Sequence, residues 1–180
     1  DAQAVGVNAV RHGDGVKAST AELALVTQLA QEGELPDQLD GGQVDVVDVS
    51  AVIEHGVRIA FIAHAGYYER DYLYGASARD FPDNPERFAF LSQAALSWAA
   101  STGHRYDIVH AHDWQTGLVP LMLQRTVPAW RGPVRPATVF TIHNLAYQGA
   151  APWHVLDYLG VTAHSLVEES ASEVNFMARG

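Results

Sequence analysis

Two short runs of β-branched residues with a helical segment between them constrain the fold of this chain more than any other feature. Residues 108–111 and 137–142 have the length and composition of buried strands, and residues 116–124 have the spacing of a helix. A strand, a helix and a strand in this order predict parallel βαβ units. The chain is therefore expected to adopt an α/β layer fold.

Further strands and another helix are predicted ahead of this unit. Val44–Val52 and Val57–Ala63 are short and rich in β-branched residues, which predicts a hairpin or two neighbouring strands. A capping box, in which Ser19 bonds the amide of Glu22, precedes apolar residues at helical spacing. This pattern predicts a helix over about residues 20–31.

A long helix is predicted to begin at Asn84. Asn84 has the side chain of a helix cap, Pro85 suits the first helical position, and Gly103 ends the apolar pattern that follows. The remaining patterns predict helices at residues 153–159 and 165–178 and loops at residues 34–43 and 64–84.

The composition disfavours several classes of function. The chain has 180 residues, of which 48% are hydrophobic and 18% charged, as in a soluble globular domain. It contains no cysteine, which excludes disulfides, thiolate zinc sites and cysteine nucleophiles. A net charge of −10 argues against nucleic-acid binding. No apolar run has the roughly 20 residues of a membrane helix, and no secretory signal pattern opens the chain.

Polar side chains follow the two central strands where each strand ends. His110, His112 and Asp113 come at the end of the first strand, and His143 and Asn144 at the end of the second. In open α/β sheets, ligands bind beyond the carboxyl ends of the strands. These residues are therefore the candidate functional site.

Each of these residues has two interpretations. His110 and His112 share one face of a strand, so they suit either a metal pair or a hydrogen-bonded residue beside a pocket-lining one. Asp113 has the carboxylate needed to bind a substrate hydroxyl, and it is also a typical N-cap residue for the helix that follows. Its local pattern favours the N-cap role. One interpretation of His143 is a hydrogen-bond donor to a sugar hydroxyl or an anionic leaving group. The other is a buried histidine that is hydrogen-bonded to the backbone.

The loop at residues 64–84 is rich in aromatic residues without a period. Aromatic rings with polar tips suit sugars, which offer apolar faces and many hydroxyls. The alternative is a small hydrophobic cluster beneath the loop. The tyrosines concerned are Tyr67, Tyr68, Tyr72 and Tyr74.

Several of these strings together are more specific than any one of them. HAHDW at residues 110–114 is followed by Gly-Leu, and TIHNLAYQG occupies residues 141–149. FPDNPERF at 81–88, YYER at 67–70 with Tyr-Gly shortly after, and VNFMARG at 174–180 complete the set. In this order and spacing they resemble glycosyltransferase family 5, the bacterial glycogen synthases and plant starch synthases. The resemblance covers about residues 55–180, whereas residues 1–54 match poorly.

The resemblance implies a Rossmann-like parallel sheet with flanking helices, as in the N-terminal lobe of a two-lobed GT-B glycosyltransferase. Residues 1–180 would form a partial N-terminal catalytic domain that lacks the C-terminal nucleotide-sugar lobe. The family's Lys-x-Gly-Gly-Leu loop, which approaches the donor phosphates, is absent as well. We therefore expect no measurable synthase activity from the isolated 180 residues.

The activity that the resemblance implies is a retaining glucosyl transfer. Glucose from ADP-glucose, a substrate, would be added to the non-reducing end of an α-1,4-glucan, with no cofactor and no metal. Expected partners are the nucleotide sugar and the glucan, without nucleic acid or membrane. The expected compartment is the bacterial cytoplasm, or a plastid for a plant protein. The choice between ADP-glucose and UDP-glucose, the oligomeric state and the role of residues 1–54 stay open.

The resemblance also assigns site residues. His143 would sit at the transferred glucose and Asp113 near the reacting sugars, which makes these two the expected catalytic residues. The expected substrate-binding residues are Tyr68, His112, Trp114, Asn144, Tyr147 and Gln148.

Two other classes of function compete with this one. The first is a non-catalytic lobe that binds α-glucan. The second is a metal hydrolase of the amidohydrolase type, which also places His-x-His at the end of a strand. That second class needs an eight-fold barrel, for which this chain is too short.

Overall fold

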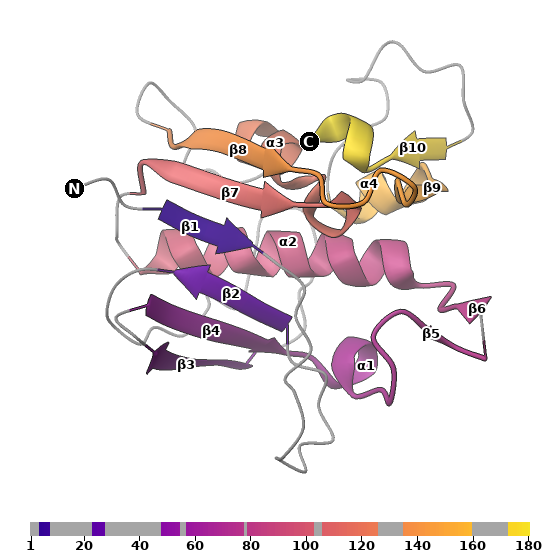
Figure 1. Cartoon of the computed structure of the whole chain (residues 1–180), viewed down its shortest axis with the longest axis horizontal. Coiled ribbons are helices and arrows are strands. Elements are labelled where there is room, and N and C mark those ends of the chain that lie inside the picture. The colour runs from indigo at the N-terminus through magenta and orange to yellow at the C-terminus, as the bar shows by residue number, and fades with distance from the viewer. Residues whose placement is uncertain are drawn as a thin grey trace.

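The computed structural model describes residues 4–7, 23–27, 48–54, 57–77, 79–102, 106–125, 135–159 and 173–180. In these residues a six-stranded sheet forms the centre of the molecule, with strand order β3-β4-β2-β1-β7-β8 (Figure 1). Its strands are β1 (Ala4–Val7), β2 (Leu23–Thr27), β3 (Asp48–Glu54), β4 (Val57–Ala63), β7 (Ile108–His112) and β8 (Ala137–Thr141).

The sheet is mixed, which corrects the prediction of a parallel sheet. Strands β1, β7 and β8 are parallel, as the βαβ pattern predicts. Strands β2, β4 and β3 pair in the antiparallel sense. The predicted hairpin is confirmed, because Glu54 pairs with Val57 across the link between β3 and β4. So short a link joins antiparallel strands, since a parallel crossover needs a dozen residues or more.

The predicted helix over residues 20–31 is wrong where the structure describes it. Leu23–Thr27 is strand β2, which pairs with β1 on one side and β4 on the other. Pairing on both sides satisfies the backbone of a central strand. Such tertiary pairing overrides a weak local helix signal like the capping box.

Helix α2 (Asn84–Ser101) packs along one face of the sheet (Figure 1). It contacts β1 and β4 on the sheet side and η1 (Trp114–Thr116), α3 (Val119–Arg125) and α4 (His154–Tyr158) elsewhere. Being enclosed on several sides, it buries even polar residues such as Ser92 and Gln93.

The start of α2 differs from the prediction in one residue. Pro85 lies in the first turn as predicted, but the N-cap position belongs to Asp83, whose side chain makes no capping bond. Asn84 lies inside the helix instead, and its amide donates to the carbonyl of Tyr74 at 2.7 Å. The end predicted at Gly103 lies outside the described residues, and the helix itself ends at Ser101.

The segment after β8 lies beyond the carboxyl ends of β7 and β8 (Figure 1). The helix predicted at residues 153–159 is confirmed as α4. The helix predicted at residues 165–178 is wrong at β10 (Glu173–Asn175), which pairs with β9 (Ala150–Pro152) and buries Val174 completely. A short 3-10 turn, η4 (Met177–Arg179), follows, whereas residues 165–172 lie outside the described part.

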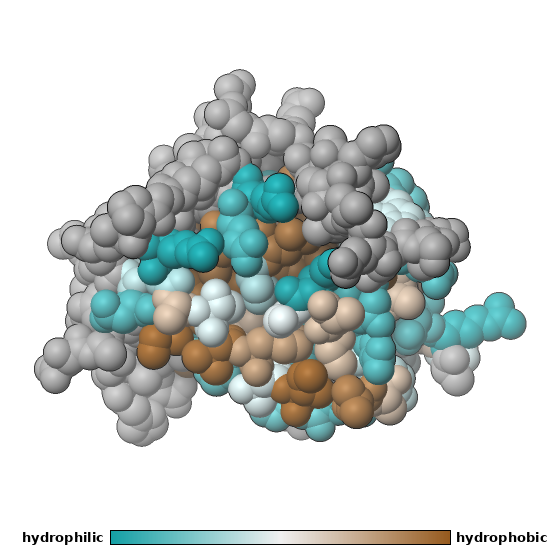
Figure 2. Space-filling model, turned by 90° about the horizontal axis from the view of Figure 1, so that it is seen from above, coloured by the Kyte–Doolittle hydropathy of each residue, from teal (hydrophilic) through white to brown (hydrophobic). Residues whose placement is uncertain are grey.

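Strand β8 forms one border of the described sheet. Its residues Ala137, Thr138 and Val139 are exposed, Val139 by 41%. Seen from the side on which β8 lies, the surface mixes hydrophobic patches with polar side chains (Figure 2). In the part of the chain that the structure describes, no helix has the length and hydropathy needed to cross a bilayer.

Candidate active site at the ends of strands β7 and β8

The two polar clusters predicted from the sequence lie side by side. Strands β7 and β8 are parallel neighbours in a register that pairs His112 with Thr141. The ladder continues one residue further, because the amide of Asp113 donates to the Thr141 carbonyl at 2.9 Å. The residues that follow each strand therefore meet at the same edge of the sheet.

The Asp113 carboxylate joins the two strand ends. Its Oδ1 accepts from the backbone amide of His143 at 2.6 Å and from that of Asn144 at 3.1 Å. Asp113 occupies the N-cap position of η1 but makes no capping bond there, so the locally favoured capping role is wrong. Its carboxylate instead holds the backbone of the second strand end.

The backbone of Asp113 is strained. Its φ of 54° and ψ of −178° lie in a region that side-chain-bearing residues rarely adopt. Such a conformation costs about 1–3 kcal/mol and persists where the surroundings enforce it, often at functional sites. The two hydrogen bonds that the carboxylate accepts from backbone amides hold this conformation, together with the hydrogen bond from the Asp113 amide to the Thr141 carbonyl.

Three imidazoles line up along these strand ends. His112 Nδ1 lies 3.0 Å from His143 Nε2, and the two rings are stacked with an interplanar angle of 16°. The ring of His110 is tilted by 32° against that of His112 with 4.0 Å between ring centroids, and His110 Nε2 lies 2.7 Å from the Thr141 hydroxyl. Among the described residues, no group of three or more His, Asp or Glu is arranged to hold a metal ion.

We expect the stability of the chain to fall as the pH drops below about 6.5. Burial lowers the pKa of His112 from its ordinary value of 6.5, and the neighbouring His110 and His143 lower it further. The unfolded chain then binds more protons than the folded one, so this contribution is present above pH 6.5 and is lost as the pH falls through the folded-state pKa. Urea unfolding of the wild type and His112→Asn between pH 5 and 8 measures it. The variant should lose less stability on acidification than the wild type does.

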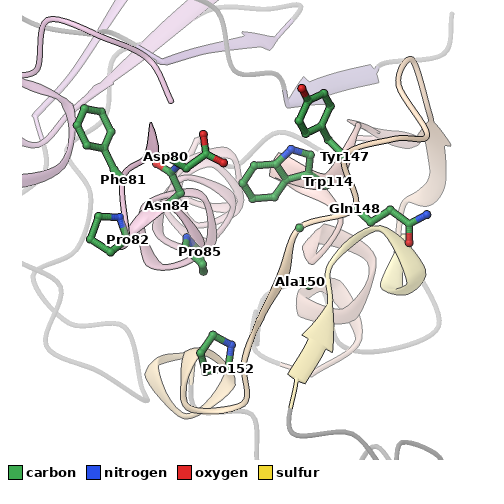
Figure 3. A pocket seen from close by; sticks show the side chains of 11 residues that line it. Asp80, Phe81, Pro82, Asn84, Pro85, Trp114, Tyr147, Gln148, Ala150 and Pro152 are labelled. Carbon is green, nitrogen blue, oxygen red and sulfur yellow. The ribbon is translucent and has the colours of Figure 1, made fainter. Parts of the chain in front are cut away.

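A cleft of about 350 Å³ opens beside Asp113. It is lined by Tyr74, Asp80, Asp113, Trp114, Gln115, Asn144 and Tyr147. A second cleft of about 330 Å³ shares Asp80, Trp114 and Tyr147 with the first and extends it toward three prolines. Figure 3 shows the second cleft, with Trp114 and Tyr147 on one side and Pro82, Pro85 and Pro152 on the other. The two clefts therefore adjoin along one aromatic wall.

Trp114 forms this wall and is held from behind. Its ring meets that of Phe88 edge to face at 5.0 Å and lies 6.2 Å from that of Phe176. Gly149, with φ of +67°, packs against the indole so closely that an added Cβ would overlap it. The carbonyl of Gly149 accepts from Phe176 N at 3.1 Å. The Trp114 ring is thus fixed by packing on residues from three separate segments of the chain.

Tyr74 lines the first cleft and is a site residue that the sequence prediction missed. Its hydroxyl accepts from Gln115 Nε2 at 3.0 Å, and the residue is 40% exposed. Burial of the ring raises the pKa of the phenol, which keeps it protonated and able to donate. Asp80 and Gln115 also line the cleft and were not predicted. The Tyr-Gly pair that follows YYER contains Tyr74, so this motif could have identified Tyr74 as a site residue. No sequence motif pointed to Asp80 or Gln115.

Tyr68 does not reach the cleft, which corrects its predicted place among the substrate-binding residues. It ends helix α1 (Ala65–Tyr68), is 0% exposed and donates to the carbonyl of Arg87 at 2.9 Å. Its ring packs near those of His64, Tyr67 and Phe90. For Tyr68, the hydrophobic-cluster interpretation of the aromatic loop is therefore the correct one.

Three other predicted binding residues border the clefts, whereas His112 and the predicted catalytic residue His143 line neither cleft. Tyr147 is 64% exposed and borders both. Asn144 lines the first cleft, and its Oδ1 accepts from the amide of Ala146. Gln148 borders the second cleft, but its side chain points away from Trp114 (Figure 3). Its Oε1 accepts a hydrogen bond from Asn175 Nδ2 at 2.8 Å.

Arg87 holds the segment that carries Tyr74. It is 0% exposed and donates to the carbonyls of Tyr67 and Leu73 and to Asn84 Oδ1. Both ends of the loop from α1 to Tyr74 are therefore tied to one side chain of α2. A two-stranded hairpin follows, formed by β5 (Gly75–Ala76) and β6 (Arg79–Asp80), and it brings Asp80 to the cleft.

A layered α/β domain with an open, aromatic-walled cleft at the carboxyl ends of parallel strands belongs to the class of domains that bind ligands through those strand ends. The chain belongs to the starch synthase catalytic domain family, whose family model matches residues 5–180. The family predicted from the sequence motifs is thereby confirmed, and the match begins well ahead of the motifs.

Curated relatives agree with this assignment. The chain is 45% identical over 96 residues to glycogen synthase 2 of Geobacter sulfurreducens, covering 53% of this chain and 20% of that protein. It is 47% identical over 104 residues to glycogen synthase of Anaeromyxobacter sp. strain Fw109-5, covering 57% and 22%. With glycogen synthase of Syntrophotalea carbinolica it shares 38% over 132 residues, covering 72% and 27%. The chain thus spans a fifth to about a quarter of these relatives.

A solved structure shows the same fold. The catalytic domain of starch synthase IV from Arabidopsis thaliana, bound to ADP and acarbose, matches with a TM-score of 0.64 and 28% sequence identity. The match covers 84% of this chain and 31% of that one.

Proposed function

We propose that the chain is part of a retaining glucosyltransferase that adds glucose from a nucleotide sugar to the non-reducing end of an α-1,4-glucan. The observation that carries this proposal is that Asp113, which lines a cleft walled by Trp114, binds the backbone amide of His143 in a member of the starch synthase catalytic domain family. We further propose that the chain is the N-terminal, Rossmann-like lobe of a GT-B enzyme. The relatives named glycogen synthase and the starch synthase bound to ADP and acarbose support both statements.

The reaction breaks the bond between the anomeric carbon and the diphosphate, and forms a bond from that carbon to a glucan hydroxyl. The hydroxyl proton leaves with the diphosphate. Positive charge develops on the sugar and negative charge on the phosphate, and fixed dipoles at these places lower the barrier. Asp113 lines the cleft as an acceptor next to the reacting sugar, and His143 provides a ring nitrogen to the transferred glucose. Because both backbones are tied together, neither group needs to reorganise during transfer.

The paired clefts supply a path for the glucan. Trp114 and Tyr147 offer ring faces to the apolar faces of sugar units, and Asp80 offers a carboxylate to hydroxyls. In this proposal the reacting end lies beside Asp113 and earlier glucose units follow toward Pro85 and Pro152 (Figure 3). By family resemblance the donor is ADP-glucose, no metal is needed, and the compartment is the bacterial cytoplasm.

Glucan extension by the complete protein that contains this chain tests the proposal. With ADP-glucose and a maltooligosaccharide, Asp113→Ala should reduce kcat by about 100-fold or more, because the carboxylate and its hold on the His143 backbone are both lost. Asp157→Ala, which removes an exposed carboxylate on α4, serves as the matched control and should retain wild-type kcat.

Other outcomes would replace this function with another. Equal kcat for Asp113→Ala and the wild type would refute the proposed role of the strand ends. Glucan binding without any extension by the complete protein would identify a binding lobe instead of an enzyme. We expect the 180-residue chain alone to give no extension, since a GT-B enzyme reacts between two lobes.

A further inference from the structure

We propose that His112 is a positioning residue for His143. Its ring binds Nε2 of His143 and so leaves Nδ1 of His143 as the nitrogen that faces a ligand. The importance of this contact for catalysis rests on the proposed function, but the hydrogen bond itself does not.

The geometry fixes both the ring and the backbone of His143. The ring is held by the 3.0 Å contact between His112 Nδ1 and His143 Nε2, with the two rings nearly parallel. The backbone amide is held by Asp113 Oδ1 at 2.6 Å. His112 and Asp113 are consecutive residues, so one turn of chain after β7 sets the position of His143 through two separate bonds.

The chemistry of imidazole gives this bond a direction. A nitrogen–nitrogen contact of this length needs one N–H and one lone pair. Neutral histidine in water prefers the tautomer with its proton on Nε2, which leaves a lone pair on Nδ1. If both residues keep that preferred tautomer, His112 Nδ1 accepts and His143 Nε2–H donates. The opposite direction would require the less favoured tautomer in both rings.

The surroundings of His112 favour the neutral, accepting form. His112 is half-buried, and its ring contacts the tilted ring of His110 at 4.0 Å and the stacked ring of His143 at 5.3 Å. Burial and the two neighbouring imidazoles oppose protonation of His112, and only Asp113 favours the charged form. Neutral His112 therefore remains an acceptor whether His143 is neutral or charged.

This arrangement leaves Nδ1 of His143, an exposed side chain, available to a ligand. Nδ1 of neutral His143 accepts a hydrogen bond from a sugar hydroxyl, and Nδ1–H of charged His143 donates to an anionic oxygen. In both states Nε2 stays bound to His112. The partner of one ring nitrogen thus decides which nitrogen is available to the ligand, as in other histidine sites.

Nuclear magnetic resonance of the ¹⁵N-labelled 180-residue chain tests the bond without any substrate. At a pH where both histidines are neutral, we expect His143 to carry its proton on Nε2 only, with a scalar coupling across the N–H···N bond to His112 Nδ1. A proton on His143 Nδ1, or the absence of the coupling in the folded wild type, would overturn the proposal.

Variants of the complete protein test the consequence. His112→Phe keeps a ring but offers no acceptor, and should lower kcat by about 10- to 100-fold, because a misplaced catalytic group reacts slowly. His112→Asn has an acceptor near the position of Nδ1 and should recover part of this loss of kcat. If His112 acted only through the size and shape of its ring, His112→Asn would not be more active than His112→Phe. His154→Gln is the control and should change nothing. Should the coupling be present while the wild-type protein transfers no glucose, the positioning bond stands and only the proposed function fails.

Discussion

Replacement of Arg87 by methionine is expected to lower the free energy of unfolding by about 3 kcal/mol or more. The variant leaves the buried Oδ1 of Asn84 and the half-buried carbonyls of Tyr67 and Leu73 without their donor. Each buried acceptor that loses its partner costs about 1–3 kcal/mol. The methionine side chain recovers part of the apolar packing, but none of the three bonds.

The aromatic rings around Arg87 strengthen this expectation. Its Nη2 is buried without a hydrogen-bond partner, but the guanidinium lies 5.4 Å from the ring centre of Phe81 and 5.5 Å from that of Phe88. These ring faces partly compensate the charge. Urea denaturation of Arg87→Met measures the loss. Arg79→Met, at an exposed position on β6, is the matched control and should stay within about 0.5 kcal/mol of the wild type. A similar small change for both variants would contradict the role assigned to Arg87.

Replacement of Gly149 by alanine is expected to destabilise the chain by about 2–4 kcal/mol. Gly149 has φ of +67°, and an added methyl group would overlap the indole of Trp114. The backbone there is fixed by the bond from Phe176 N, so it cannot move aside without losing a second contact. We therefore expect both a lower melting temperature and a displaced aromatic wall.

A second glycine provides the control for this prediction. Gly66 lies in helix α1, and an added Cβ would meet only the His64 ring edge at 3.3 Å. Gly66→Ala should leave stability nearly unchanged, because alanine also favours the helix. Calorimetry of both variants decides the matter, and equal melting temperatures would show that the fit of Gly149 against Trp114 is loose.

The elements that were predicted correctly are those with strong local signals. Strands β7 and β8 are short runs of β-branched residues, and α2 begins at an Asn-Pro-Glu sequence typical of a helix start. The elements that were missed depend on distant partners. Strand β2 forms because β1 and β4 flank it, and β10 forms because β9 is beside it. No pattern within a short window contains that information.

The same distinction applies to the candidate site. That Asp113 and His143 meet was predictable, because the carboxyl ends of adjacent parallel strands lie at one edge. That the Asp113 carboxylate holds two backbone amides, and does not cap η1, depends on a register and a backbone angle that the sequence does not display. Which tyrosine reaches the cleft depends on Arg87, whose bonds set the path from Tyr68 to Tyr74.

The support behind Trp114 has a consequence for the order of events during synthesis on the ribosome. The backbone amides of Phe176 and Met177 donate hydrogen bonds to the carbonyls of Gly149 and Gln148, respectively. Gly117 lies directly against the Phe176 carbonyl. A nascent chain that has emerged only as far as His143 already contains both histidine-bearing strand ends, but of the residues behind the indole it contains only Phe88. The ability to bind a sugar should thus be acquired only after roughly sixty further codons beyond Trp114 have been read.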